Sequence, residues 1–147
     1  MVSNPTETES AEAEALVHAQ STKLASQPTY RSITIRNPPH IYLRLSLLAS
    51  TLPSSNQPPV DTLTARTYLT SALSQFLGLT GTAIPIDFLK VEARDVWIRV
   101  PREDSAAVVG ALSQWIGKDG GVSWRVKGKG EWLGAVAAGD GSQLFEP

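Results

Sequence analysis

Basic and aromatic side chains alternate within the stretch DFLKVEARDVWIRVPRED, at residues 87–104. A second basic stretch, WRVKGKGEWLG, follows at residues 124–134. Lysine and arginine neutralise phosphates and aromatic rings stack on unpaired bases, so these residue types favour noncovalent binding of RNA. The candidates for RNA contact are Lys90, Arg94, Arg99, Arg125, Lys127 and Lys129. Phe88 and Trp97 are candidates either for base stacking or for packing against a protein partner.

Two observations weaken the RNA interpretation. Glu92 and Asp95 dilute the positive charge, and the outward side of a strand often carries Lys and Arg for solubility alone. The stretch ARDVWIRV also lacks the Lys/Arg-Gly pair and the interleaved aromatics of an RNA-recognition motif. Taken alone, the pattern slightly favours a solvated strand face, and sequence-specific reading of bases is not expected.

The residues that covalent or metal chemistry requires are missing. The chain has no cysteine, and its two histidines, His18 and His40, are too few for a metal cluster. In GKGEWLG the third glycine falls one place too late for a dinucleotide-binding loop, and there is no P-loop. Asp87, Glu92 and Asp95 surround a turn rather than a pocket, which disfavours acid-base catalysis. We therefore expect no catalytic residue, no metal site and no cofactor.

Hydrophobic periodicity places these residues on strands and helices. Residues 41–47 alternate between apolar and polar, as in a half-buried strand, and residues 32–36 predict a short strand before it. Asp61 is placed to cap a helix that ends at Gly78, with a buried stripe that includes Phe76. Residues 87–100 predict a hairpin with Leu89 inward and Phe88 outward.

A second helix follows the hairpin, beginning near Pro101 and burying a stripe that ends at Ile116. Residues 122–127 predict the last strand, and GKGEWLG predicts a mobile basic turn. The order β-α-β-β-α-β is the α+β, ferredoxin-like arrangement, a four-stranded antiparallel sheet with two helices on one face. The RNA candidates would then lie on the open face.

The outward sides of both helices are predicted to be uncharged, because no charged residue occurs between Arg66 and Asp87 or between Asp104 and Lys118. A solvated helix normally carries charges, so these sides favour contact with a protein over a merely exposed surface. The interface candidates, besides Phe88 and Trp97, are Thr67, Thr70, Ser71, Ser74, Ala107, Gly110 and Ala111.

The remaining segments are predicted to be tails. Residues 1–29 are acidic and poor in large apolar side chains, which predicts disorder, and residues 137–147 predict a flexible C-terminal tail around a domain at 30–136. Trp132, Leu133 and Val136 would form a short helix on the body or dock on a partner. No apolar run is long enough to span a bilayer, so a membrane is not an expected partner.

Four stretches resemble one known family: LTARTYL, GTAIPIDFLKVE, DVWIRVPRED and WRVKGKGEWLG. They are similar to the Pop-eight type of protein subunit of fungal ribonuclease P and ribonuclease MRP, within the wider Pop-five/Rpp-fourteen family. The resemblance covers residues 30–136. It implies a nuclear and nucleolar ribonucleoprotein in which RNA cleaves precursor tRNA 5′ ends or precursor rRNA. The partners it implies are a Pop-five-type subunit, forming a heterodimer, and the ribonuclease P and MRP RNAs.

The resulting hypothesis is a non-catalytic assembly subunit whose helices meet protein and whose basic residues face RNA backbone. The alternative is a ferredoxin-like protein-protein interaction module with no role in RNA binding.

Overall fold

The computed structural model describes residues 29–138 of the 147-residue chain. The predictions for residues 1–28 and 139–147 lie outside the described residues. Residues 29–35 belong to a separate unit and form no helix or strand, so the strand predicted at 32–36 is wrong. The body begins at Arg36. Its elements are β1 (His40–Ala49), η1 (Ser54–Asn56), α2 (Thr62–Ala83), β2 (Asp87–Glu92), β3 (Asp95–Pro101), α3 (Ser105–Gln114), β4 (Val122–Gly130) and α4 (Leu133–Ala137).

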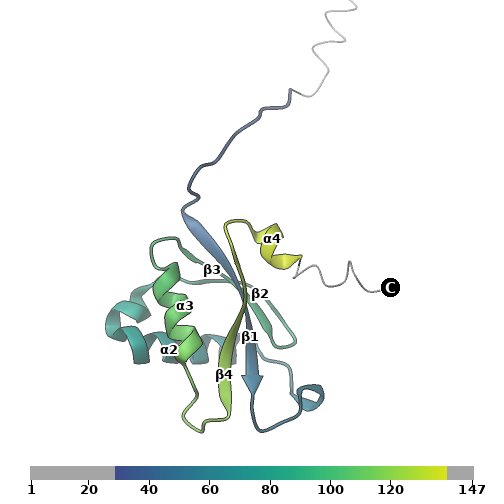
Figure 1. Cartoon of the computed structure of the whole chain (residues 1–147), viewed down its shortest axis with the longest axis vertical. Coiled ribbons are helices and arrows are strands. Elements are labelled where there is room, and N and C mark those ends of the chain that lie inside the picture. The colour runs from purple at the N-terminus through teal and green to yellow at the C-terminus, as the bar shows by residue number, and fades with distance from the viewer. Residues whose placement is uncertain (1–28, 139–147) are drawn as a thin grey trace, which may run out of the picture. The chain divides into compact units, whose positions relative to one another are not determined.

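The four strands form one antiparallel sheet in the order β2-β3-β1-β4. Helices α2 and α3 contact each other and lie on one face of the sheet, while α4 lies on the opposite face (Figure 1). The ferredoxin-like prediction is therefore confirmed. The third helix is an addition to it, because it covers part of the face expected to be open. Within the described residues no helix is long and apolar enough to cross a membrane.

The core forms between the sheet and the helix pair α2/α3. Strands β1 and β3 pair without interruption from His40 opposite Pro101 to Ser46 opposite Asp95. Every second residue of both strands is buried, as the alternation predicts. The largest fully buried side chains come from β1, β3 and α3, and they are Leu43, Leu45, Ile98, Leu112, Val96, Val100 and Val108.

Helix α2 begins at an aspartate cap and is interrupted by a glycine. Asp61 accepts a hydrogen bond from the backbone N–H of Thr64, and hydrogen bonding with Thr64 lowers the pKa of its carboxyl. The regular helix stops at Gly78, which has a φ of 65°, a value that glycine adopts without steric cost. A second helical segment then runs to Ala83. The predicted stop at Gly78 is correct, and the second segment was not anticipated. Phe76, predicted to be inward, is 40% exposed.

Both outer strands carry a register shift. In β2, Phe88 pairs with Ile98 and Lys90 pairs with Trp97, which leaves Leu89 as the extra residue. The prediction for this pair is therefore wrong: Phe88 packs against the core on the helix side, and Leu89 is 40% exposed. In β4, Leu45 pairs with Val126 but Arg44 pairs with Gly128, so Lys127 is the extra residue.

The predicted mobile turn GKGEWLG is a strand end followed by a helix. Strand β4 continues to Gly130, and α4 begins at Leu133. Val136 is buried, and a Cβ on Gly130 would lie only 2.9 Å from its Cγ2 atom. The two small residues Gly128 and Gly130 thus let α4 approach the sheet. Trp132, before α4, stays 51% exposed.

The end of α3 also differs from the prediction. Trp115 leaves the helical conformation with ψ of 133°, so helical periodicity no longer applies beyond it. Trp115 is buried, whereas Ile116 is 58% exposed and forms an isolated bridge with Ser123 of β4.

Candidate RNA and protein interfaces

The open face of the sheet displays three cross-strand rows of side chains. The strand register gives these rows, in the order β2, β3, β1, β4: Asp87, Arg99, Tyr42, Gly130; Lys90, Trp97, Arg44, Gly128; and Glu92, Asp95, Ser46, Arg125. Asp87 lies directly opposite Arg99 in the first row. Between the second and third rows, Arg44 pairs diagonally with Asp95, and Lys90 pairs with Glu92 of the same strand. The face is a set of ion pairs around one tryptophan rather than a uniformly basic surface.

Trp97 occupies the middle of this face and is almost completely covered. Its side chain is 7% exposed, with the Arg44 Cζ atom 5.2 Å and the Lys90 Nζ atom 5.3 Å from its ring centroid. Such cation-π contacts are attractive. The Trp97 Nε1–H is buried and finds no acceptor among the described residues. Because two cations already cover the ring, Trp97 packs the open face and does not offer a free stacking platform.

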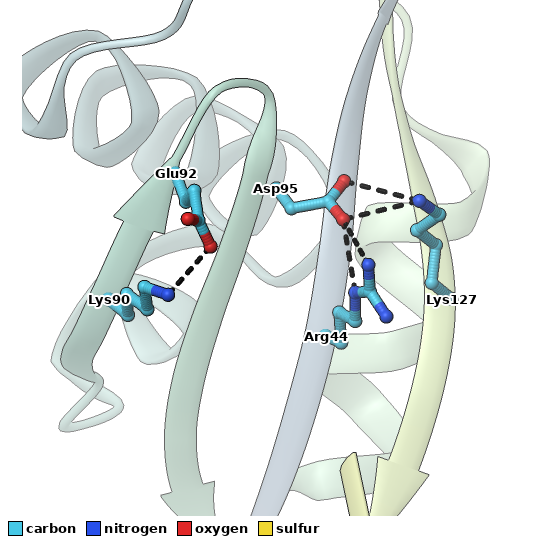
Figure 2. Close-up of polar contacts among 5 residues, drawn as sticks. All are labelled: Arg44, Lys90, Glu92, Asp95 and Lys127. Carbon is cyan, nitrogen blue, oxygen red and sulfur yellow. Dashed lines mark hydrogen bonds and ion pairs between the residues drawn. The ribbon is translucent and has the colours of Figure 1, made fainter. Parts of the chain in front are cut away.

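Asp95 of β3 binds two cations, one from the adjacent strand β1 and one from β4 beyond it, as Figure 2 shows. Arg44 of β1 donates through Nε at 3.0 Å and Nη2 at 2.6 Å, and Lys127 of β4 donates from 3.2 Å, all to the Asp95 Oδ2 atom. Burial alone would raise the pKa of Asp95, but hydrogen bonds from Arg44, Ser46 and Lys127 together hold that pKa below its ordinary value. We call Arg44, Asp95 and Lys127 the Asp95 triad.

Two further pairs lie toward the β2 edge, and we call them the outer pairs. The Lys90 Nζ lies 2.6 Å from Glu92 Oε2 (Figure 2), and the Arg99 Nη2 lies 2.7 Å from Asp87 Oδ2. The carboxylate of Asp87 raises the pKa of Arg99 further above its ordinary value. The side chains of the outer pairs are 39–61% exposed, against 16% for Asp95.

Arg94 is occupied by the chain itself. Its guanidinium donates to the Leu47 carbonyl at 2.6 Å and to the Pro58 carbonyl at 2.8 Å, and burial lowers its pKa. These bonds tie the hairpin turn to the end of β1 and to the loop before α2. Arg94 was predicted to contact RNA, but these hydrogen bonds to the backbone give it a structural role.

The remaining basic candidates lie on β4. Arg125 is on the open face opposite Ser46, whereas Lys129 is opposite Leu43 and so on the helix side, beyond the register shift at Lys127. Both are exposed, and neither is paired with a carboxylate within residues 29–138. We call Arg125, Lys127 and Lys129 the β4 ridge. On the open face, Val136 lies against Gly128 and Gly130.

The interface candidates on the helices separate into exposed and buried residues. On α2, Thr67, Thr70 and Ser74 are exposed and Ser71 is half-buried. Together with Leu63, which is 72% exposed, the three exposed residues form an uncharged stripe at helical spacing. On α3, Ala107 is exposed and Gly110 has open space around it, but Ala111 is only 3% exposed and belongs to the core. Ala111 is therefore wrong as an interface residue.

Sequence reasoning missed the organising role of Arg44, Asp95 and Ser46. Arg44 and Ser46 were visible as outward positions of β1, but their pairing with Asp95 depends on strand order and register. Phe88 was also misplaced: it lies on the helix side with the Arg66 Cζ atom 4.7 Å above its ring. No group of three metal-ligating side chains occurs in the part of the chain that the structure describes.

Comparison with known proteins agrees with the arrangement of the body. None of the curated protein sequences resembles the chain significantly. A chain in the cryo-EM structure of yeast ribonuclease MRP has a similar fold, with a TM-score of 0.60 and 22% identity over 68% of this chain and 79% of that one. The model of the family described as ribonucleases P/MRP protein subunit Pop8 matches residues 39–115. That match spans β1 to α3, more than half of the chain, and the chain therefore belongs to the Pop8 family of ribonuclease P/MRP protein subunits.

Proposed function

We propose that this chain is a non-catalytic protein subunit of the ribonuclease P and MRP ribonucleoproteins, supporting RNA-catalysed processing of precursor tRNA 5′ ends and precursor rRNA. The family match over residues 39–115 is the observation that carries the proposal. The charged side chains of the open face also support it, because they form ion pairs rather than converging on a cavity. The pairs are Arg44 with Asp95, Lys90 with Glu92 and Arg99 with Asp87. The proposal includes a nuclear, nucleolar location.

The proposed protein partner is a Pop-five-type subunit, bound as a heterodimer through the uncharged sides of α2 and α3. The stripe of Leu63, Thr67, Thr70 and Ser74 supports this contact, because it is exposed, free of charge and includes a large apolar side chain. An unpaired charge buried at such a surface is strongly unfavourable. The stripe can therefore be tested without touching the core.

The experiment is isolation of the tagged full chain from cells under stringent washing, followed by sequencing of bound RNA and identification of bound proteins. We expect the noncoding RNA of ribonuclease P or MRP together with other protein subunits. A protein dimer free of RNA would contradict the proposal and favour the alternative, an interaction module without a role in RNA binding.

A charge placed on the stripe tests the protein contact separately. Thr70→Arg is expected to lower the amount of partner protein recovered at least tenfold. Ser55→Arg adds the same charge at an exposed position within η1 and serves as the control. Equal recovery of the partner with both variants would rule out the α2 stripe as the interface.

A further inference from the structure

We infer that the chain contacts the phosphate backbone of RNA through the β4 ridge, and that the centre of the open sheet face does not bind RNA. The inference rests on the proposed function, because it identifies the surface through which the subunit meets RNA. Three observations carry it: the charge left over after ion pairing, the neutrality of the outer pairs, and the register shift at Lys127.

The first observation is a surplus of positive charge at the β4 edge. Asp95 supplies one negative charge to two cations, Arg44 and Lys127, so the Asp95 triad retains one positive charge. Arg125 and Lys129 add two more, since neither has a carboxylate partner among the described residues. RNA binds most favourably to lysine and arginine side chains that can replace its counterions without first breaking an ion pair of their own.

Lys127 is the more loosely held cation of the Asp95 triad. Arg44 reaches Asp95 with two nitrogens, the nearer at 2.6 Å, whereas the single Lys127 nitrogen is 3.2 Å away and its side chain is 41% exposed. The ammonium of Lys127 can therefore turn toward a phosphate while Arg44 keeps Asp95 neutralised. Arg44 itself is committed to Asp95 and to the Trp97 ring.

The second observation is that the outer pairs leave no surplus. Lys90 is matched by Glu92 and Arg99 by Asp87, and all four side chains are exposed. A phosphate that approached either cation would meet a carboxylate within the same pair. These pairs therefore do not attract a polyanion to the β2 edge, although the sequence alone makes Lys90 and Arg99 as good candidates as Arg125.

The third observation is that the β4 ridge reaches both sides of an edge strand. Strict alternation would place Arg125, Lys127 and Lys129 on one face, but the extra residue Lys127 shifts the register. Arg125 then lies on the open face and Lys129 on the helix face. An RNA backbone that follows the edge of β4 is contacted from both sides, whereas one that crosses the sheet meets the covered Trp97.

Basic residues on an edge strand have another known use, since they discourage pairing with the edge of a second molecule. That interpretation predicts that removing the charges causes self-association and leaves RNA binding unchanged. The two interpretations are therefore separable by measuring both properties on the same variants.

The test compares two double variants of the full chain that lose the same charge. Arg125→Gln with Lys129→Gln removes two cations from the β4 ridge, and Lys90→Gln with Arg99→Gln removes two from the outer pairs. The probe is the transcribed RNA component of ribonuclease MRP, and the binding constant is measured by fluorescence anisotropy over a series of NaCl concentrations. Sedimentation velocity reports self-association, and circular dichroism reports the fold.

The logarithm of the binding constant falls as the logarithm of the salt concentration rises. We expect this slope to be less negative by about two in the β4 variant, one for each lost phosphate contact. The ratio of the native binding constant to that of the β4 variant then falls about tenfold between about 50 and 200 mM NaCl. The conservative variant Arg125→Lys with Lys129→Arg should keep the native slope. The outer-pair variant should change the slope by less than half as much.

An unchanged slope for the β4 variant, or an equal fall for the outer-pair variant, overturns the inference. Self-association of the β4 variant with a native slope also overturns it, in favour of edge protection. The proposed function is judged separately, by whether the native chain is isolated from cells with the noncoding RNA. If the native chain is isolated with the RNA but the β4 variant keeps the native salt slope, the inference is refuted and the proposed function stands.

Discussion

The Asp95 triad and the outer pairs are built from the same kinds of side chain on the same sheet face, yet their surroundings differ. Asp95 is 16% exposed, accepts hydrogen bonds from two strands and lies beside the buried Trp97. The outer pairs are 39–61% exposed and each joins two side chains only. Exposed ion pairs contribute little to stability because water and salt screen them, whereas removing one partner of a shielded pair leaves the other uncompensated. The comparison therefore predicts a steep gradient of effects across one surface.

The largest effect is expected at Trp97, which packs beside the Asp95 triad. Trp97→Ala should lower the free energy of unfolding by about 3 kcal/mol, because it removes a large buried side chain and its cation-π contacts. Urea unfolding followed by circular dichroism measures this loss. Trp97→Phe is the control: it keeps an aromatic ring and removes the Nε1–H that lacks an acceptor, so it should lose less than half as much.

Asp95→Asn should come next, with a loss of about 2 kcal/mol, because hydrogen bonds to a charged acceptor contribute about this much. The substitution leaves Arg44 and Lys127 without their shared carboxylate while preserving the shape of the side chain. Urea unfolding at neutral pH is again the measurement. A loss below about 0.5 kcal/mol would remove the distinction between the Asp95 triad and the outer pairs.

The same carboxylate gives a third, smaller effect that depends on pH. The pKa of Asp95 is lower in the folded chain than its ordinary value of 3.8. The ionised carboxylate therefore contributes its full stability above about pH 4, and that contribution is lost as the pH falls through the folded pKa. The difference in unfolding free energy between the native chain and Asp95→Asn should shrink from pH 5 to pH 2.5. A constant difference over that range would mean that the fold does not lower the Asp95 pKa.

The smallest effect is expected at the outer pairs. Glu92→Gln should change the free energy of unfolding by less than about 0.5 kcal/mol, because the Lys90 and Glu92 side chains are both more than half exposed. The comparison is sharpened by repeating the measurement at high salt, where the small difference should vanish. A loss as large as that of Asp95→Asn would show that exposure does not separate the two sets of ion pairs.

The sequence predicted the elements whose periodicity is unbroken. Leu43, Leu45, Ile98 and Val100 alternate over the full length of β1 and β3, and their burial follows directly. The helix cap at Asp61 and the interruption at Gly78 were also predictable from the sequence, because each depends on a local backbone preference. These features need no knowledge of the neighbouring strands.

The missed features depend on contacts between segments far apart in the sequence. Phe88 lies on the helix side and Leu89 is left unpaired because of a register shift, which period-two alternation does not anticipate. The division of the basic residues into paired and unpaired ones depends on which acid lies across the sheet from each. Arg99 and Arg125 look equivalent in sequence, but only Arg99 has a carboxylate partner within the described residues.

The two register shifts also determine where the chain tolerates a change in length. Leu89 and Lys127 are each extra to the pairing of their strand, so deleting either one leaves the flanking residues opposite their present partners. A deletion within β1 or β3, whose pairing is uninterrupted from His40 to Ser46, would turn every following side chain to the opposite face. Relatives of this chain that differ in length within the sheet should therefore differ at the outer strands and keep the central two at constant length.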